Sequence, residues 1–522
     1  MDVTTVVLRH VKQGGADAPA LSLEDAAAWT YGQLAHETYK TANALLDIGI
    51  APGDRVGILL KNSLEYWATY LAVARIGAIS VRLNWRLAPA ELSYALADSG
   101  VSVLVVHGEL LESFDAAVTS AEELRETIVV APIAPSQLTP HRLDYSHFVA
   151  DASSDEPDVP HPADDDACMI MYTSGTTGFP KGATWSHGNT LWFSAIQSSH
   201  WHFDRSTVHF STLPMFHVGG FEDWCLPTLT GGGHVVVLSS GAFDITRTCD
   251  LARHHGASSI GLLPTMIYAL LDLPDANQEL LGDVRTIYTG GSPIFREAVD
   301  KLRADFSRIS LQQTYGLTEG GALVAVMDQE NIDRHPMSVG RPLPYTEIRV
   351  AQLNDESLDA AADEDGHLWV RSPGVCGNYY GKPEATAETF LDGWCRTGDL
   401  ARLTPDNFLY ITGRVKDMII SGGENIYPVE IENALSSHPA VRDVAVIGVT
   451  DAKWGETPCA LIVLREGVPQ PEPAEIVTYV TDRLASYKKP KYVEFVDELP
   501  RNASGKVLKR VLKEQFDRHV TA

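Results

Sequence analysis

The sequence predicts an α/β fold that is divided into several domains, and three observations support this prediction. The chain has 522 residues, which is too long for one ordinary domain and corresponds to roughly three core-sized units. Apolar residues make up 44% of the chain and charged residues 21%, so the chain can build hydrophobic cores. Short, solidly apolar runs alternate with segments of helical periodicity, which is typical of a sheet covered by helices on both faces.

The first third of the chain shows this alternation most clearly. Residues 31–46, 64–76 and 91–98 have apolar side chains mainly at helical spacing, so they are predicted as helices. Continuous apolar runs typical of buried strands are found at 56–60, 78–83 and 101–106.

The later part of the chain divides into further units. An acidic, proline-containing connection at 151–167 precedes a second α/β stretch that extends to about residue 326. Its apolar strands are predicted near 234–238, 259–263 and 285–289. Between 340 and 412 the strands become shorter and turns more frequent, which indicates a smaller β-rich unit. Residues 416–522 have α/β signals of their own, including apolar runs at 443–449 and 460–464.

Composition excludes several classes of protein. The chain has 41 Lys and Arg against 68 Asp and Glu, a net charge of −27 that argues against a nucleic acid partner. Its six cysteines include no CxxC pair, which argues against a zinc ribbon and a disulfide framework. The start of the chain shows no secretory signal, and no stretch approaches ~20 apolar residues. We therefore expect a cytoplasmic protein, monomer or homodimer, without an integral membrane segment.

The charge is unevenly distributed along the chain. From Arg414 onward there are 15 Lys and Arg and 16 Asp and Glu, so this segment is nearly neutral and the preceding part carries almost all the negative charge. A near-neutral segment would suit a lid that closes on an anionic ligand. A chance excess of surface lysine would explain it equally well.

The stretch 172–182, YTSGTTGFPKG, follows an apolar run and has the composition of a polyphosphate-binding loop. Glycines permit tight turns and close approach to a ligand, while hydroxyls and one lysine can bind phosphate oxygens. It is not a Walker A loop, because Pro180 precedes the lysine and Gly182 follows it. The alternative is a generic Gly/Ser/Thr surface loop. The residues of this loop that would contact the phosphates of such a ligand are Thr173, Ser174, Gly175, Thr176, Thr177, Gly178 and Lys181.

Six further motifs follow the loop in order along the chain. They are GGSP at 290–293, YGLTE at 315–319, TGD at 397–399, GRVKD at 413–417, SGGEN at 421–425 and PRNASGK at 500–506. With the loop, they make the chain resemble the adenylate-forming superfamily of acyl-CoA synthetases, luciferases and peptide-synthetase adenylation domains. The resemblance covers nearly the whole chain.

This resemblance implies a specific domain organisation. A large N-terminal domain would contain two α/β subdomains and a small β-rich subdomain, and a small mobile α+β lid domain would follow it. We expect the N-terminal AMP-binding domain at residues 1–413, a hinge at 414–416 and the C-terminal lid at 417–522.

The resemblance also implies ATP, Mg²⁺ and coenzyme A as cofactors and a small-molecule carboxylate as substrate. An enzyme that joins a carboxylate to ATP must neutralise two anions that repel one another. Lys506 would bridge the carboxylate and the α-phosphate, and Glu319 together with Thr176 would bind Mg²⁺, a hard cation that prefers oxygen ligands. The further ATP-binding residues implied by the motifs are Gly291, Ser292, Tyr315, Gly316, Thr318, Asp399 and Arg414.

Each of these roles has an ordinary structural alternative. Tyr315 would pack on adenine, although an isolated tyrosine is more often a core residue. Asp399 would accept hydrogen bonds from the ribose hydroxyls, or it could be a turn or cap residue. Arg414 would contact ribose or phosphate. Lys506 and Glu319 could be solvated surface residues if the motifs around them were absent.

The resemblance places the hinge at Lys416, where a backbone rotation would swing the lid between the adenylation and thioester-forming arrangements. After Lys506 leaves, residues 421–425 would line a pantetheine tunnel, in which Gly422 and Gly423 leave room beside Glu424. Trp454 would pack near the CoA nucleotide, or it could pack between strands of the lid.

A second group of candidates resembles the segment beside the acyl pocket of the family. This group consists of His217, Gly219, Gly220, Phe221 and Glu222. His217 would orient the carboxylate or gate the tunnel, or it could be an ordinary loop histidine; the two glycines would open space for the acyl group. Glu222 and Asp223 depart from the fatty-acid ligases, which usually have apolar or neutral residues here. Because buried carboxylates are costly unless paired, we expect these two to point to solvent, or else to meet a polar or amino-bearing substrate.

Three functions remain possible at this stage. The first is an ATP-dependent carboxylate–CoA ligase for a medium- or long-chain fatty acid or an aryl or cinnamic-type acid. The second is an adenylating enzyme with another acceptor, which loads a carrier protein or activates nitrite for diazotisation of an aryl amine. The third is an inactive nucleotide-binding module, which the presence of Lys506, Glu319 and Asp399 argues against.

Overall fold

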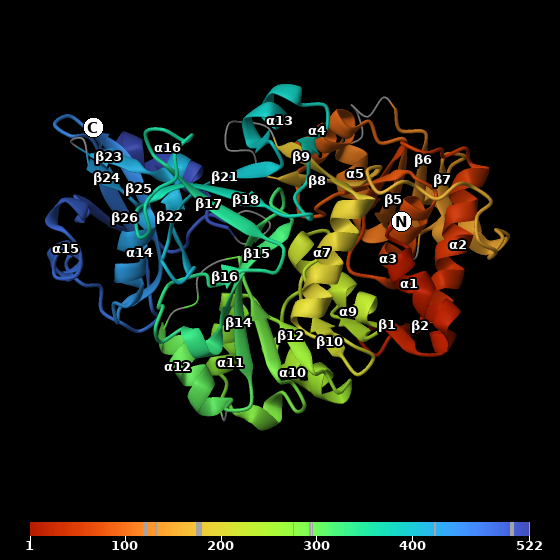
Figure 1. Cartoon of the computed structure of the whole chain (residues 1–522), viewed down its shortest axis with the longest axis horizontal. Coiled ribbons are helices and arrows are strands. Elements are labelled where there is room, and N and C mark those ends of the chain that lie inside the picture. Colours follow the sequence, from red (N-terminus) through yellow and green to blue (C-terminus); the bar gives the residue numbers. More distant parts are fainter. Residues whose placement is uncertain are drawn as a thin grey trace.

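The computed structural model describes residues 1–117, 123–130, 133–173, 180–274, 276–291, 294, 296–421, 424–501 and 506–520. The chain forms two large sheets, a smaller sheet and a separate C-terminal unit (Figure 1). In Figure 1 the C-terminal elements are blue and lie at the left, whereas the N-terminal elements are red and orange and lie at the right. The predicted α/β class, with a large N-terminal domain and a small C-terminal domain, is confirmed.

The first large sheet has eight strands in the order β19-β9-β8-β4-β3-β5-β6-β7. Strands β3 to β8 run parallel, while β9 and β19 are antiparallel additions at one edge. The strands are β3 (Arg55–Leu59), β4 (Ile79–Arg82), β5 (Val103–His107), β6 (Glu126–Val130), β7 (Arg142–Asp144), β8 (Ala167–Thr173), β9 (Lys181–Ser186) and β19 (Asn378–Tyr379).

The helices of this subdomain begin at well-formed caps. The side chain of Thr30 accepts a hydrogen bond from the Gln33 N–H, and that of Ser63 accepts one from the Tyr66 N–H. The helices are α2 (Tyr31–Asp47), α3 (Leu64–Arg75), α4 (Pro89–Ser99), α5 (Leu111–Ala117) and α6 (Tyr145–Ala150). The elements predicted in the first third of the chain are confirmed, with ends that differ by one or two residues.

The second large sheet has nine strands in the order β16-β15-β14-β13-β12-β10-β11-β1-β2. Its strands are β1 (Pro19–Leu23), β2 (Ala27–Thr30), β10 (Val208–Ser211), β11 (His234–Val237), β12 (Ser259–Gly261), β13 (Thr286–Thr289), β14 (Ser310–Leu317), β15 (Ala322–Asp328) and β16 (Arg341–Pro342). The helices associated with this sheet are α1 (Thr5–His10), α7 (His187–His200), the short α8 (Val218–Phe221), α9 (Cys225–Gly231), α10 (Ile245–His254), α11 (Pro264–Leu271) and α12 (Arg296–Asp305).

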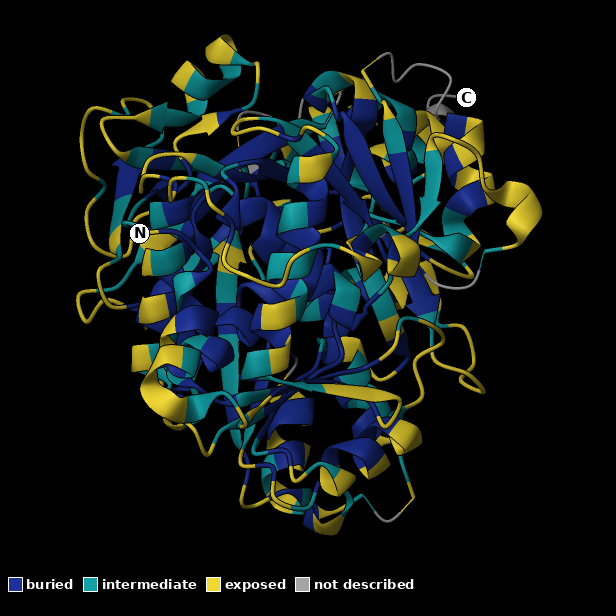
Figure 2. Cartoon of the chain, turned by 90° about the vertical axis from the view of Figure 1, so that its right-hand side faces the viewer, coloured by how far each residue is buried: buried dark blue, intermediate teal, exposed yellow. Residues whose placement is uncertain are grey.

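The core consists of alternating layers of helix and sheet. Residues of α1, α2, α3, α7 and α9 pack in one cluster with residues from both sheets, so these helices lie between them. Helices α4 and α5 cover the outer face of the first sheet, and α10, α11 and α12 cover the outer face of the second. Figure 2 shows buried residues concentrated in the strands and in the helix faces that meet them. Both faces of each sheet are buried, which explains why the strands read as continuous apolar runs.

The β-rich subdomain and the C-terminal unit complete the chain. The former contains β17 (Glu347–Gln352), β18 (Gly366–Arg371), α13 (Pro383–Thr389), β20 (Phe390–Leu391), β21 (Trp394–Leu403) and β22 (Leu409–Arg414). The latter, which we call the lid, contains β23 (Ile419–Ser421), β24 (Glu424–Ile426), α14 (Pro428–Ser436), β25 (Val441–Asp451), β26 (Gly455–Leu464), α15 (Pro473–Thr481), β27 (Tyr492–Phe495) and α16 (Lys509–Val520).

Two composition-based expectations can be compared with the structure. All six cysteines are buried and free, as the absence of a disulfide framework predicts. Within the part of the chain that the structure describes, no helix combines the length and apolar character needed to cross a bilayer.

Candidate active site

The predicted phosphate loop joins two neighbouring antiparallel strands. Thr173 at the end of β8 pairs with Lys181 at the start of β9, so the two ends of the loop lie side by side. Lys181 Nζ is 5.1 Å from the centre of the Tyr379 ring, within the range of a cation–π contact. The remaining loop candidates, Ser174, Gly175, Thr176, Thr177 and Gly178, lie outside the described residues.

Glu319 lies directly beside the base of this loop. Its Oε1 accepts a hydrogen bond from Thr173 Oγ1 at 2.8 Å and another from the Tyr379 hydroxyl at 2.9 Å. Burial and the negative charge of Glu319 raise the pKa of Tyr379, so the phenol stays protonated and donates. A single carboxylate next to a phosphate loop fits Mg²⁺, which usually takes one or two carboxylates together with phosphate oxygens and water.

The turn between β14 and β15 holds Glu319 in place. A Cβ on Gly316 would lie 1.6 Å from the carbonyl oxygen of Ala322, so only glycine fits at this position. The carbonyl of the buried Thr318 accepts a hydrogen bond from Trp185 Nε1 at 3.1 Å, and the Glu319 carbonyl accepts one from the Cys376 N–H at 3.2 Å. Gly316 and Thr318 therefore have packing roles in the structure, and their expected contacts with ATP remain predictions.

Tyr315, Asp399 and Arg414 form a hydrogen-bonded group. The Tyr315 hydroxyl donates to Asp399 Oδ2 at 2.5 Å, and Arg414 Nε is 2.9 Å from Asp399 Oδ1. Asp399 is buried, and both of its oxygens already have protein partners. A ribose hydroxyl would therefore have to share the Asp399 oxygens with Tyr315 and Arg414, or displace one of these two residues from Asp399.

A glycine pair after β13 borders the same region. A Cβ on Gly290 would lie 2.6 Å from Thr314 Oγ1, and Gly291 has a φ of +81°, which favours glycine. These constraints keep the backbone free of side chains at the carboxyl end of the strand, where ligands bind in open α/β sheets. Ser292 lies outside the described residues.

Lys506 of the lid is close to the groups of the N-terminal domain. Neighbouring protein atoms replace part of the water around the exposed Lys506 side chain and lower its pKa to about 8, and the positive charges of Arg414 and Lys416 act in the same direction. The charges of Asp399 and Glu319 oppose this shift. The structure therefore brings the catalytic candidates of both domains together. Lys416 lies in a short turn, Val415–Asp417, directly after β22.

The expected CoA-binding residues are only partly described. Gly422 and Gly423 lie outside the described residues, while Glu424 begins β24 and pairs with Ser421. Trp454 is 47% exposed, with Lys453 Nζ 4.4 Å from its ring centre. This exposure contradicts the alternative that Trp454 is a packing residue between lid strands. The backbone N–H groups of Lys453 and Trp454 both donate to Asp451 Oδ1 at 2.9 Å, which fixes this turn.

His217 caps the short helix α8. Its Nδ1 accepts a hydrogen bond from the Gly219 N–H at 3.1 Å, so the neutral imidazole carries its proton on Nε2. Protein atoms that replace part of the water around the exposed His217 side chain lower its pKa to about 4, and the charges of Arg82 and Lys506 lower it further. The neutral form of His217 is therefore favoured at pH 7, and the residue lies close enough to Lys506 for the lysine charge to disfavour its protonation.

Three residues assigned to the acyl pocket are instead packed in the core. A Cβ on Gly220 would lie 2.1 Å from the Pro214 carbonyl oxygen, so this glycine permits close packing and opens no space for an acyl chain. Phe221 is fully buried, with its ring stacked on Trp67 at 3.8 Å between centres. Glu222 is fully buried and forms an ion pair with Arg82. The expectation that Glu222 and Asp223 point to solvent is wrong, because both are buried.

Sequence reasoning missed two residues that organise this site. Arg82 is fully buried; its guanidinium contacts Glu222 and the carbonyl of Met215, and it donates to the Tyr66 hydroxyl at 3.0 Å. One arginine within an otherwise apolar predicted strand was a signal that could have identified it. No feature of the sequence marks Tyr379 in this way. Its strand, β19, belongs to the β-rich part of the chain and joins the first sheet by pairing with β9.

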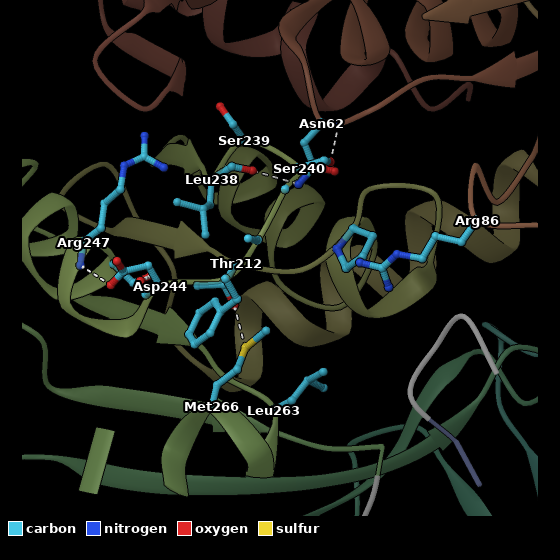
Figure 3. Close-up of a pocket in the computed structure, with 15 residues that line it drawn as sticks. Asn62, Arg86, Thr212, Leu238, Ser239, Ser240, Asp244, Arg247, Leu263 and Met266 are labelled. Atoms are coloured by element: carbon cyan, nitrogen blue, oxygen red, sulfur yellow. Dashed lines mark hydrogen bonds between the residues drawn. The ribbon is translucent and has the colours of Figure 1, made fainter. Parts of the chain in front are cut away.

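A small cavity of about 110 Å³ lies next to the His217 segment (Figure 3). Asn62 organises its wall: its Nδ2 donates to the carbonyls of Leu213 and Leu238 at 3.0 and 2.9 Å, and its Oδ1 accepts from the Met215 N–H at 2.8 Å. The lining also includes Arg86, Thr212, Pro214, Leu263 and Met266.

Comparisons with known proteins agree with this geometry. Residues 8–380 match the model of the AMP-binding enzyme family, and residues 430–506 match the AMP-binding enzyme C-terminal domain. A feruloyl-CoA synthase from Amycolatopsis sp. is 37% identical over 493 residues, covering 94% of each chain. The long-chain-fatty-acid–CoA ligase FadD13 of Mycobacterium tuberculosis is 35% identical over 492 residues, covering 93% of each. The crystal structure of an anthranilate CoA ligase in complex with anthranoyl-AMP has a TM-score of 0.91 at 25% identity and covers 100% of this chain and 98% of that chain. The chain therefore belongs to the AMP-binding enzymes of the adenylate-forming superfamily.

Proposed function

We propose that this protein is an ATP-dependent carboxylate–CoA ligase. In the first half-reaction it would form an acyl-adenylate and release pyrophosphate, and in the second it would form an acyl-CoA thioester and release AMP. The proposal rests mainly on the position of Lys506, whose charge interacts with Glu319, Asp399 and Arg414 across the boundary between the domains. Acid–thiol ligase activity, with ATP and CoA as co-substrates, agrees with the named activities of the relatives.

In the first half-reaction, a carboxylate oxygen attacks the α-phosphorus of ATP, and the bond to the pyrophosphate oxygen breaks. The Lys506 ammonium would neutralise the carboxylate and the α-phosphate as they approach. Thr173 and Lys181 at the ends of the loop would contact the phosphates, and Tyr315, Asp399 and Arg414 would contact the nucleoside. Glu319 would hold Mg²⁺, which would reduce the negative charge of the phosphates.

In the second half-reaction, the thiolate of CoA attacks the acyl carbon, and AMP leaves with the bonding electrons of the carbon–oxygen bond. We propose residues 1–413 as the N-terminal domain, 414–416 as the hinge with Lys416 at its centre, and 417–522 as the lid. Rotation at the hinge would replace Lys506 by the segment 421–425, and the exposed Trp454 would contact the CoA nucleotide.

A pyrophosphate-release screen tests this function. Fatty, aryl and amino-aryl acids are supplied with ATP and Mg²⁺, with and without CoA, and the nucleotide product is identified. We expect AMP and an acyl-CoA thioester when CoA is present. Release of ADP and orthophosphate would contradict adenylate chemistry. AMP without a thioester would instead support another acceptor, and nitrite with an aryl amine is included for this case.

A further inference from the structure

Asp223 is a buried carboxyl group with an unusual environment. It lies between α8 and α9 and is only 6% exposed, and its Oδ1 has no hydrogen-bond partner among the described residues. The neighbouring Glu222 is fully buried and differs in having a counter-charge, because its Oε1 is paired with Arg82, although its Oε2 also has no hydrogen-bond partner among the described residues. Because a buried polar group without a partner costs free energy, the position of Asp223 calls for an explanation, and a bound ligand would provide one.

The position of Asp223 relates it to the site of adenylate formation. A Cβ on Gly219 would lie 3.6 Å from Asp223 Oδ2 and 3.3 Å from His217 Nδ1. The space that Gly219 leaves is therefore bordered by this carboxyl group and by His217. Gly220 differs, because the corresponding space is filled by the Pro214 carbonyl. A substrate that lies against Gly219 would reach Asp223 through Oδ2, whereas the buried oxygen without a partner is Oδ1 of the same carboxyl group.

The residue after Asp223 begins an aromatic cluster. The rings of Trp224 and Tyr288 are stacked, with centres 5.4 Å apart and planes 14° apart, and His209 lies 6.2 and 6.0 Å from them. Gly261 lies directly beside the Trp224 ring, since a Cβ at this position would be in van der Waals contact with it at 3.4 Å. Flat, rigid aromatic groups favour contact with another planar ring.

The aromatic cluster also contains polar atoms that lack partners. Trp224 Nε1 and His209 Nε2 are buried without a hydrogen bond to any residue that the structure describes. Burial lowers the pKa of His209 to about 3, so this histidine is neutral, and its Nδ1 is 3.0 Å from Ser259 Oγ. Together with Asp223 Oδ1, these atoms make this part of the core unusually polar.

We propose, on the basis of the ligase function proposed above, that Asp223 determines acid specificity by accepting a hydrogen bond from an O–H or N–H group on the ring of an aryl acid. The ring would lie on the side of Asp223 that borders Gly219. Burial and the charge of Glu222 raise the pKa of Asp223 and so favour its neutral acid form, whose carbonyl oxygen still accepts a hydrogen bond from a donor at the Gly219 side.

The test compares acids that differ only in the ring substituent. Benzoic and cinnamic acids are compared with their ortho, meta and para hydroxy and amino derivatives, and hexanoic acid represents fatty acids. We expect kcat/KM for thioester formation to be at least about tenfold higher for one of the derivatives than for the unsubstituted acid. The hydroxy and amino series show which donor is preferred.

Variants connect this preference to Asp223. In Asp223→Leu the ratio of kcat/KM between the preferred derivative and its unsubstituted parent should fall close to one. Asp223→Asn keeps a carbonyl acceptor and should retain part of the ratio. Asp2→Asn is the matched control: Asp2 is also buried, but it has Thr4 and His161 as partners, so this variant should leave the ratio unchanged. Thermal unfolding shows that each variant is folded, and we expect a higher midpoint for Asp223→Asn.

The outcomes separate the two proposals. Wild-type enzyme that forms thioesters but shows no donor preference, or prefers hexanoic acid, would overturn the role of Asp223 and leave the ligase function intact. A preference that is unchanged in folded Asp223→Leu and Asp223→Asn would also overturn it. Absence of AMP and thioester with every acid would instead contradict the ligase function itself.

Discussion

At the scale of single residues, Lys506 can be separated experimentally from the rest of the lid. We expect Lys506→Ala to reduce pyrophosphate release by about 100- to 1,000-fold, because the carboxylate and the α-phosphate lose the charge between them. Thioester formation from preformed acyl-AMP should stay close to wild type. The control is Lys509→Ala, since Lys509 pairs with Glu432 inside the lid at 2.6 Å. Equal losses in both half-reactions would contradict domain alternation.

The lowered pKa of Lys506 makes adenylation sensitive to alkaline pH. The ammonium form is the active one, and a pKa of about 8 means that its population falls as the pH rises above 8. We expect pyrophosphate release to decline by about tenfold per pH unit above this value. Lys506→Arg should be slower but should keep a flat profile to about pH 10, because the guanidinium stays protonated. A wild-type profile that is flat to pH 10 would show that Lys506 is not the titrating group.

At the scale of secondary-structure elements, Arg82 joins β4 to the segment that carries His217. Arg82→Met should cost about 3 to 5 kcal/mol, because it leaves Glu222 buried without a counter-charge. Removing both charges in Arg82→Met with Glu222→Leu should restore much of this stability. The measurement is the shift of the urea unfolding midpoint.

Measuring kcat separates two possible roles of Arg82: stabilising the fold through its pair with Glu222, and positioning the segment that carries His217. The double variant still lacks the contacts of Arg82 with the carbonyls of Met215 and His217, so its kcat should remain low although its stability recovers. Arg75→Met is the matched control: Arg75 is also buried, but it binds the carbonyls of Pro157 and Val159. Full recovery of kcat in the double variant would limit Arg82 to a stabilising role.

At the scale of the whole molecule, the lid must move between the half-reactions. Lys416 lies in the short turn between β22 and the lid. Proline at this position restricts φ, so Lys416→Pro should hinder the rotation while still permitting the arrangement in which Lys506 reaches the site. We expect a pyrophosphate burst of about one equivalent, with acyl-CoA formation reduced about tenfold or more. Unimpaired thioester formation would place the pivot elsewhere.

The amino-acid sequence alone determined the class of fold and the chemistry of the nucleotide site. Apolar runs such as 56–60 and helical spacing such as 31–46 correspond closely to β3 and α2, because local periodicity reflects burial on regular elements. The phosphate loop and the motif around Lys506 carry the functional groups of adenylation in short, continuous stretches. Residue types and spacing are sufficient to identify such stretches.

The tertiary structure alone decided which residues meet. Arg82 pairs with Glu222 across 140 positions of the chain, and Tyr379 reaches Glu319 across 60. The same packing leaves Asp223 Oδ1 buried without a partner among the described residues, whereas the sequence predicts either solvent exposure or contact with a polar substrate. Local sequence cannot fix such contacts, because they depend on how the two sheets and the β-rich subdomain pack, and this packing sets both the burial and the neighbours of each charge.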